Sequence, residues 1–179
     1  MKTKTLAVTL ALAAGLAAVG AAQAEGKIYV GAKIGDMNPD SPGFNDVHTL
    51  GIYGGYNLLG KDAHFASDLR GGTLAVEGEV NMTATKAKAG PAGKWDITEL
   101  GVYAAYRHPV ADNFYLKGKA GLVRYDINTT VPSAYSGTET KLSLGIGGGY
   151  KVGPGNLEAE ITTYESNVLF VSAGFHMAF

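Results

Sequence analysis

The stretch Val168-Leu-Phe-Val-Ser-Ala-Gly-Phe-His-Met-Ala-Phe179 decides the fold class of this chain of 179 residues. Every second residue from Leu169 to Phe179 is apolar, and the residues between them are small or polar, with the exception of Phe170. A period of two is typical of a β-strand with two chemically different faces. A water-soluble protein rarely leaves such an apolar edge uncovered, because it invites aggregation. We therefore predict a strand whose outer face contacts lipid.

The same alternation recurs seven times before this final strand. The expected strands cover residues 28–35, 49–58, 73–82, 99–107, 114–123, 141–150 and 157–162. Eight is the smallest even strand number of bacterial outer-membrane barrels, and an open sheet edge in lipid would leave backbone groups without hydrogen bonds. The sequence therefore predicts an all-β fold, an eight-stranded antiparallel up-and-down transmembrane β-barrel whose last strand pairs with the strand containing Ile28 and Ile34.

The N-terminal region is typical of a secretory signal peptide. Lys2 and Lys4 precede an apolar run from Leu6 to Val19, and Ala22-Gln23-Ala24 provides an A-x-A cleavage signal. We expect residues 1–24 to be a cleaved signal peptide and residues 25–179 to be the outer-membrane barrel domain. An uncleaved N-terminal helix is the alternative.

The composition agrees with an exported, glycine-rich β protein. The chain has no cysteine and 26 glycines, and glycine disfavours long helices. Loss of residues 1–24 leaves 13 basic and 16 acidic residues, a net charge of −3. No basic patch indicates a nucleic-acid partner.

The connections between the expected strands suggest an orientation. The segments 108–113 and 153–156 are short and rich in turn-forming residues, as expected of periplasmic turns. Longer polar segments are expected to form extracellular loops: Asp36 to Val47, Thr83 to Lys94 and Asp126 to Gly137. Two connections fit less well, because 59–69 is long for a periplasmic turn and 165–167 is short for an outer loop.

The inward face of the expected barrel is rich in charge of both signs. Unpaired charges in so narrow an interior are costly, so we expect them to pair across the lumen. The expected lumen charge network consists of Lys33, Glu77, Glu79, Glu99, Arg107, Lys117, Lys119, Lys141, Glu158 and Glu160. Two interpretations remain open, a network that plugs the barrel and a narrow polar channel lined by these charges. Inward glycines leave space that inward tyrosines can fill, namely Tyr29, Tyr53, Tyr103 and Tyr115.

Outward aromatic residues gather towards the strand ends. Such rings are typical of the girdle at a membrane interface, although tyrosine and phenylalanine also favour strands in general. The residues concerned are Tyr56, Tyr106, Phe114, Tyr150, Phe175 and Phe179.

Several of these features together resemble a known family. The Tyr-Val-Gly-Ala-Lys segment at residues 29–33, the Gly-Ile-Tyr-Gly-Gly-Tyr segment at 51–56 and the terminal phenylalanine are similar to those of small outer-membrane β-barrel proteins. That group includes opacity-protein-like surface antigens, OmpX/Ail-type proteins and the N-terminal barrel of OmpA. The resemblance implies that Phe175 and Phe179 carry the recognition signal for the barrel assembly machinery. It also implies location in the outer membrane of a Gram-negative bacterium and adhesin-like, immune-evasion or stabilising roles, usually through extracellular loops.

Hydrolysis of a lipid A acyl chain would require a nucleophile with a base in reach, typically serine with histidine. Lipid A deacylase barrels of this kind place His and Ser two residues apart on one strand, and neither His108 nor His176 has a serine at that spacing. Ser172 and His176 share a face but lie four residues apart, roughly 13 Å along a strand. We therefore expect no enzyme activity and no catalytic residue.

A calcium site is not expected either. The pattern Asp36-x-Asn38-x-Asp40 begins like an EF-hand loop, but Ser41 stands where glycine is required and Val47 where glutamate is required. We expect no metal and no cofactor.

The function expected from the sequence is structural, with surface interactions through the loops of a largely plugged barrel. The expected partners are outer-membrane lipid and lipopolysaccharide, the assembly machinery, and host or environmental ligands. A narrow porin-like channel for small polar solutes is the alternative, and lipid A modification is a third possibility.

Overall fold

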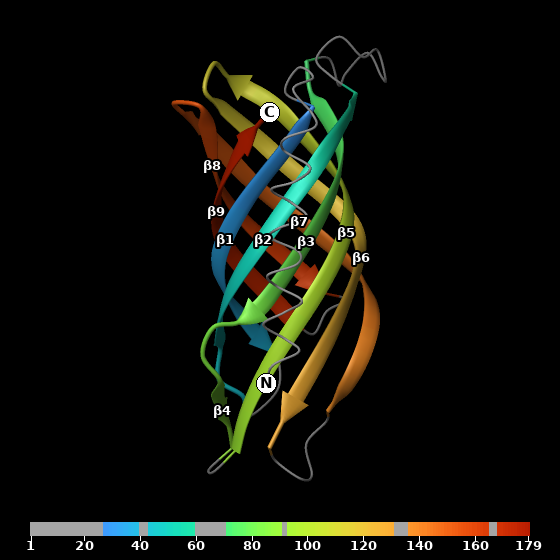
Figure 1. The fold of residues 1–179 in the computed structure, drawn as a ribbon, viewed down its shortest axis with the longest axis vertical. Helices are drawn as coiled ribbons and strands as arrows, with labels where there is room; N and C mark the ends of the chain where they lie inside the picture. The colour runs from blue at the N-terminus through green and yellow to red at the C-terminus, as the bar shows by residue number, and fades with distance from the viewer. Residues whose placement is uncertain (1–26, 40–42, 60–70, 91–92, 131–135, 165–167) are drawn as a thin grey trace.

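A computed structural model describes residues 27–39, 43–59, 71–90, 93–130, 136–164 and 168–179. It contains nine β-strands, which wind around a common axis in Figure 1. Their bounds are β1 (Ile28–Pro39), β2 (Val47–Leu59), β3 (Thr73–Thr83), β4 (Ala87–Ala89), β5 (Gly93–Ala111), β6 (Phe114–Thr129), β7 (Gly137–Val152), β8 (Gly155–Tyr164) and β9 (Val168–Ala178). In these ranges no helix is long and apolar enough to cross a membrane. The expected signal peptide lies outside the described residues.

The strands form a closed antiparallel barrel. Each wall strand pairs with its neighbour along the chain, and the short β4 pairs with β5 beyond the end of β3, so that β3 and β4 share one position in the wall. The wall therefore has eight positions. β1 closes it by pairing with β9, and Ile34 lies opposite Ala173. The predicted fold is confirmed, including the closure by the C-terminal strand.

The two ends of the barrel differ. At the terminus end, which holds the start of β1 and the end of β9, two-residue turns connect β5 to β6 at 112–113 and β7 to β8 at 153–154. Gly153 has a φ of 57°, a conformation that glycine adopts without strain. Both turns are shorter than the predicted segments 108–113 and 153–156, because the ladders continue to Ala111 and from Gly155.

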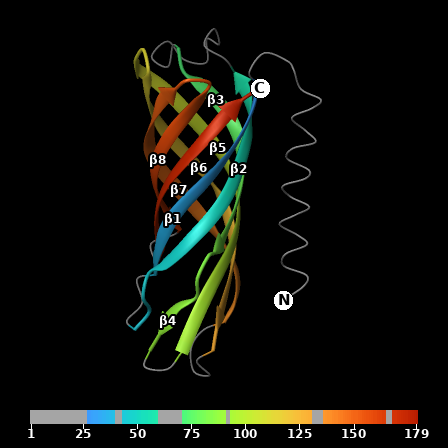
Figure 2. The ribbon, with the colours of Figure 1, turned by 60° about the vertical axis from the view of Figure 1, so that its left-hand side comes forward.

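At the other end, the loop end, the strands continue well beyond their predicted limits. β5 has 19 residues, which span about 60 Å at roughly 3.3 Å per residue, whereas about 9–11 residues cross a membrane. β4 and β5 extend beyond the end of β3 in Figure 2. The predicted loop bounds are therefore wrong: Asp36–Pro39 belong to β1, Asp126–Thr129 belong to β6, and β4 lies within 83–94. Residues 60–69 and 165–167, which fitted the expected pattern poorly, lie outside the described residues.

The physical reason is that the alternation changes phase near the loop end. In the middle of β5 the apolar residues Leu100 and Val102 point outward, with 53% and 56% exposure. Closer to the loop end Trp95 and Ile97 point inward and are buried, while Asp96 between them points outward. An outward apolar face suits lipid, and an inward one suits water outside. The inversion therefore marks the edge of the lipid-facing belt, and the barrel continues beyond it with an apolar core.

Candidate functional site: the interior of the barrel

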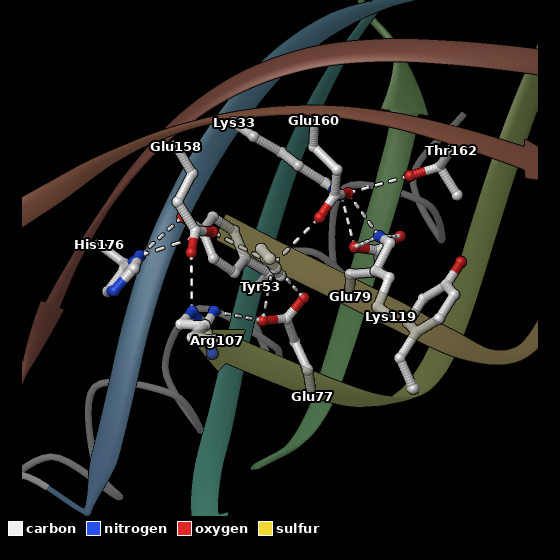
Figure 3. Close-up of polar contacts among 12 residues, drawn as sticks. Lys33, Tyr53, Glu77, Glu79, Arg107, Lys119, Glu158, Glu160, Thr162 and His176 are labelled. Carbon is white, nitrogen blue, oxygen red and sulfur yellow. Dashed lines mark hydrogen bonds and ion pairs between the residues drawn. The ribbon is translucent and has the colours of Figure 1, made fainter. Parts of the chain in front are cut away.

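A continuous ion-pair network fills the middle of the barrel. Cations and carboxylates alternate along it, as Figure 3 shows for most of its members. It comprises Lys33, Arg107, Lys117 and Lys119, together with Glu77, Glu79, Glu158 and Glu160. The strand geometry explains how they meet, because residues two apart point to the same side of a sheet. β3, β6 and β8 each supply one pair of inward residues with this spacing.

Lys117 occupies the centre of the network. Its ammonium nitrogen lies 2.9 Å from a carboxylate oxygen of Glu77 and 3.1 Å from oxygens of both Glu158 and Glu160. Arg107 joins the same carboxylates towards the terminus end, at 2.8 Å from Glu77 and 2.8 Å from Glu158. Two cations are therefore held by a shared set of carboxylates, and no member can be removed without leaving a buried charge short of partners.

The network continues through Glu79 and Lys119. The Lys119 ammonium lies 2.6 Å from Glu160 and 3.0 Å from Glu79, and Lys33 lies 2.5 Å from the same Glu79 oxygen. Lys119 also sits over the ring of Tyr103, 4.1 Å from its centroid, a favourable cation–π position. Ion pairs and aromatic faces thus replace the water that these cations would otherwise bind.

Inward tyrosines lie over glycines of neighbouring strands. A Cβ built on Gly149 would lie 2.1 Å from the Tyr115 ring, and one on Gly55 would lie 2.2 Å from the Tyr29 hydroxyl. The cavity between Lys33, Glu77 and Glu160 has a volume of about 10 Å³, close to the space that one water molecule needs. Side chains thus occupy most of the space at this level of the barrel.

The structure differs from the sequence-based network at two residues. Lys141 lies outside it, and its ammonium is 3.4 Å from Glu139 on the same strand, with a side chain about one third exposed. Glu99 is inward and buried, but it accepts hydrogen bonds from Tyr164 and Asn81 and forms no ion pair with a described residue. Alternation predicted the side of the wall correctly, but it does not encode the height of a side chain along the barrel.

An apolar cluster fills the interior beyond the network, towards the loop end. Its buried members are Met37, Val47, Ala89, Trp95, Ile97, Val123, Tyr125, Tyr164, Val168 and Phe170. The lipid-facing alternation does not predict this cluster, because it places much of these strand ends in loops. The inverted alternation at Trp95 and Ile97 was the signal that could have revealed it.

The described part of the β1–β2 connection packs onto this cluster. The Trp95 indole nitrogen donates to the backbone oxygen of Asn45 at 3.0 Å, and the Phe44 ring meets Trp95 edge to face. The Gly90 nitrogen donates to the Gly43 oxygen at 2.7 Å, so the backbone after β4 also holds this segment. Residues 43–46 therefore help to cover the loop end.

The terminus end contains a larger cavity. It has a volume of about 430 Å³ and is lined in part by Tyr29, Arg107, Tyr115 and His176, together with both turns. His176 is buried, and its Nδ1 atom and the Tyr53 hydroxyl form a hydrogen bond of 3.1 Å. Arg107, at the inner side of the cavity, is already paired with two carboxylates.

The serine and histidine that a catalytic site would need lie inside the barrel, and the calcium-like segment is described only in part. Ser172 and His176 both lie buried inside the barrel, where they do not face lipid. Among the described residues no group of three or more His, Cys, Asp or Glu is placed to hold a metal ion. In the calcium-like segment Asp36 pairs with His48, and Asp40 and Ser41 lie outside the described ranges.

A comparison with protein families gives the same answer as the geometry. Residues 7–170 match the model of the outer membrane protein beta-barrel domain. The chain belongs to this family. As an outer-membrane barrel it resides in the bacterial outer membrane, and its apolar outer belt is the surface that meets lipid.

Several solved structures share the fold at low sequence identity. Ail, the attachment invasion locus protein of Yersinia pestis, is 14% identical with a TM-score of 0.53, covering 84% of this chain and 94% of Ail. Neisserial surface protein A is 18% identical with a TM-score of 0.50, covering 85% and 96%. The designed barrel TMB2.3 is 14% identical, also at 0.50, covering 88% and 97%. No curated protein matches the chain. These likenesses show the fold alone.

The outer-membrane barrel presents aromatic rings on its outer surface near the terminus end. Tyr56, Phe114, Tyr150 and Phe175 are between 39% and 52% exposed, and Phe114 lies opposite Tyr150 in the ladder. The backbone nitrogen of Phe179 donates to the Ile28 oxygen at 2.8 Å, which ties the end of the chain into the barrel seam. The recognition role of Phe175 and Phe179 in assembly stays a prediction.

Proposed function

We propose that this protein is a closed barrel that contributes to outer-membrane structure and presents its loop end for surface contacts, rather than a transport pore. The observation that carries this proposal is that two groups of side chains occupy the interior one after the other along the barrel axis, first charged and then apolar. The salt-bridged network surrounds a cavity of only about 10 Å³ beside Lys117, and an apolar cluster lies beyond it. Hydrated solutes would have to disrupt both.

The proposed orientation places the loop end outside the cell. Export by the cleaved signal peptide of residues 1–24 and recognition of Phe175 and Phe179 by the assembly machinery would deliver the termini to the periplasmic side. The part of the barrel beyond the lipid belt would then stand in the lipopolysaccharide layer. Arg124 follows the outward Leu122 at the edge of that belt, where a guanidinium can bind the phosphates of lipopolysaccharide.

The orientation can be tested with single cysteines, since the chain has none. Lys88 on β4 and Lys151 near the β7–β8 turn are both exposed and lie at opposite ends. In intact cells a membrane-impermeant maleimide should label the Lys88→Cys variant, but label Lys151→Cys only after the outer membrane is permeabilised. The opposite pattern would show that the orientation is inverted.

The proposed surface role is supported by the fold that this chain shares with Ail, whose name describes attachment and invasion. Cells that carry the gene should adhere to host-cell or abiotic surfaces at least several-fold better than cells that lack it. A Lys88→Ala, Lys94→Ala variant should lower adhesion if the loop end makes the contact, whereas Lys151→Ala should not. Equal adhesion with and without the gene would leave only the structural role.

Two other activities have less support. A channel is favoured by the cavity of about 430 Å³ at the terminus end, which could serve as its entrance. Arg107 at the inner side of this cavity belongs to the ion-pair network, however, and the network would block the path of a solute. A lipid A-modifying activity would need a nucleophile and a base that face lipid, and Ser172 and His176 face the interior.

A further inference from the structure

The charges in the middle of the barrel do not balance once Glu99 is included. Eight residues form the ion-pair network, four cations and four glutamates. Glu99 is a fifth inward glutamate, only 1% exposed, while Lys141, which would equalise the count, pairs with Glu139 elsewhere. A buried carboxylate without a cation is costly in so dry a setting.

The hydrogen bonds around Glu99 are unbalanced as well, because acceptors outnumber donors. Its Oε2 atom accepts from the Tyr164 hydroxyl at 2.6 Å and from the Asn81 amide nitrogen at 3.1 Å. Its Oε1 atom is buried and has no partner among the described residues, and neither has the Oδ1 atom of Asn81. The site thus contains two buried acceptors and lacks a donor.

We propose that Glu99 is a buried proton-binding site, a carboxylic acid that keeps its proton at neutral pH. A protonated carboxyl group carries an O–H donor, whereas a carboxylate only accepts. A proton on Oε1 removes the uncompensated charge, converts one of the two orphaned acceptors into a donor, and leaves Oε2 to accept from Tyr164 and Asn81 as observed.

A proton fits this site better than a metal ion. Calcium requires six to eight oxygen ligands, and the orphaned oxygens at Glu99 and Asn81 number two. No cluster of three His, Cys, Asp or Glu side chains suited to a metal occurs in the part of the chain that the structure describes.

The groups around Glu99 are already committed to other partners. The charged side chains that act on it are Lys33 from β1, Glu79 from β3 and Lys119 from β6, and these three pair with one another or with Glu160. The phenols nearby are Tyr103 on its own strand, Tyr125 opposite it on β6, and Tyr164 on β8. Two of these phenols donate hydrogen bonds to residues of β7, Tyr103 to Ser143 and Tyr125 to Glu139.

Glu99 lies next to the apolar cluster, so its protonation affects the stability of the closed barrel. Tyr164 and Tyr125 belong to the apolar cluster, so Glu99 lies where the charge network ends and this cluster begins. Loss of the proton would create a lone charge beneath the cluster. Unfolding above about pH 4.3, where a free glutamate ionises, releases this proton, so raising the pH favours the unfolded state.

Two matched substitutions test the proposal. Glu99→Gln keeps the shape of a neutral acid, and Glu79→Gln removes the same charge from a glutamate that pairs with Lys33 and Lys119. At about pH 4 the unfolding equilibrium constant of Glu99→Gln should stay within about threefold of the wild type. At pH 7 it should fall below the wild-type value, by up to about a few hundredfold, because unfolding of the variant releases no proton. Glu79→Gln should instead raise the constant at pH 7 about a hundredfold. Glu99→Gln should also lose part of the fall in stability that the wild type shows as the pH rises.

Infrared spectroscopy of the wild-type barrel gives a readout that does not depend on the folding of a variant. The spectrum at pH 7 should contain the carbonyl stretch of a protonated carboxyl group, which shifts in D₂O and is absent from Glu99→Gln. A wild-type spectrum without this band would overturn the proposal. Equal destabilisation by Glu99→Gln and Glu79→Gln would also overturn it, because Glu99 would then act as an ionised partner.

Discussion

Replacing Lys117 with methionine is expected to destabilise the barrel by about 3–5 kcal/mol, the cost of breaking a buried ion pair from one side. Lys117 contacts Glu77, Glu158 and Glu160 beside a cavity with room for about one water molecule. Methionine fills a similar volume but supplies no charge. Three carboxylates then share fewer cations, and neither protein nor solvent can compensate them.

The measurement is urea-induced unfolding of the barrel refolded into lipid vesicles, with Lys141→Met as the matched control. Lys141 is also an inward lysine, but it is about one third exposed near the loop end, so its removal should cost only about 0–1 kcal/mol. Similar decreases in the free energy of unfolding for both variants would show that the ion pairs of Lys117 contribute no more to stability than a surface pair.

The network is better understood as a device for specificity than as a source of stability. Apolar residues of similar volume often replace a buried ion pair without loss. A slip of one residue in strand register would, however, turn Lys117 and Lys119 towards lipid. The inward charges on β3, β6 and β8 therefore penalise a slip of one residue, which is useful in a fold built from similar strands.

Replacing Trp95 with alanine is expected to destabilise the barrel by about 3–5 kcal/mol, through the cavity left by a large buried side chain. Trp95 is 1% exposed in the apolar cluster. It also holds residues 43–46 through its hydrogen bond to Asn45 and its contact with Phe44. The variant should therefore lose stability and also become more sensitive to protease within this connection.

Lys94→Ala is the control for this prediction, because Lys94 is adjacent but points outward. Exposed substitutions of this kind usually change stability by no more than about 0.5 kcal/mol. Trp95 is the only tryptophan in the chain, so its blue-shifted emission in Lys94→Ala would show that the cluster is intact. A loss of less than about 1 kcal/mol in Trp95→Ala would contradict a packed core at this end.

The sequence was sufficient for the fold because two environments impose one simple pattern. Lipid outside and a polar lumen inside require strict alternation, and Leu100 and Glu99 illustrate it on adjacent positions of β5. The same rule led to the wrong loop bounds, since it does not hold beyond the lipid. Trp95 and Ile97 follow the pattern of a water-soluble barrel, so the lipid-facing pattern alone predicts too early a boundary for this strand.

The pairing inside the barrel could be predicted only in part. Alternation places Lys141 and Glu99 on the inner face, as observed for their strands. It says nothing of which residues meet across the lumen, because the stagger between neighbouring strands sets their relative heights. The sequence predicts a network of five cations and five glutamates. In the structure four of each pair with one another, Lys141 pairs with Glu139, and Glu99 has only neutral hydrogen-bond partners among the described residues.

Planar-bilayer recording from the purified wild-type barrel tests the central claim of a closed interior most directly. Since the network around Lys117 and the cluster around Trp95 both occupy the lumen, we expect insertion into the bilayer, verified by protease protection, without steady single-channel current in concentrated KCl. Steady current that saturates with salt concentration would contradict a closed barrel and would establish the narrow channel.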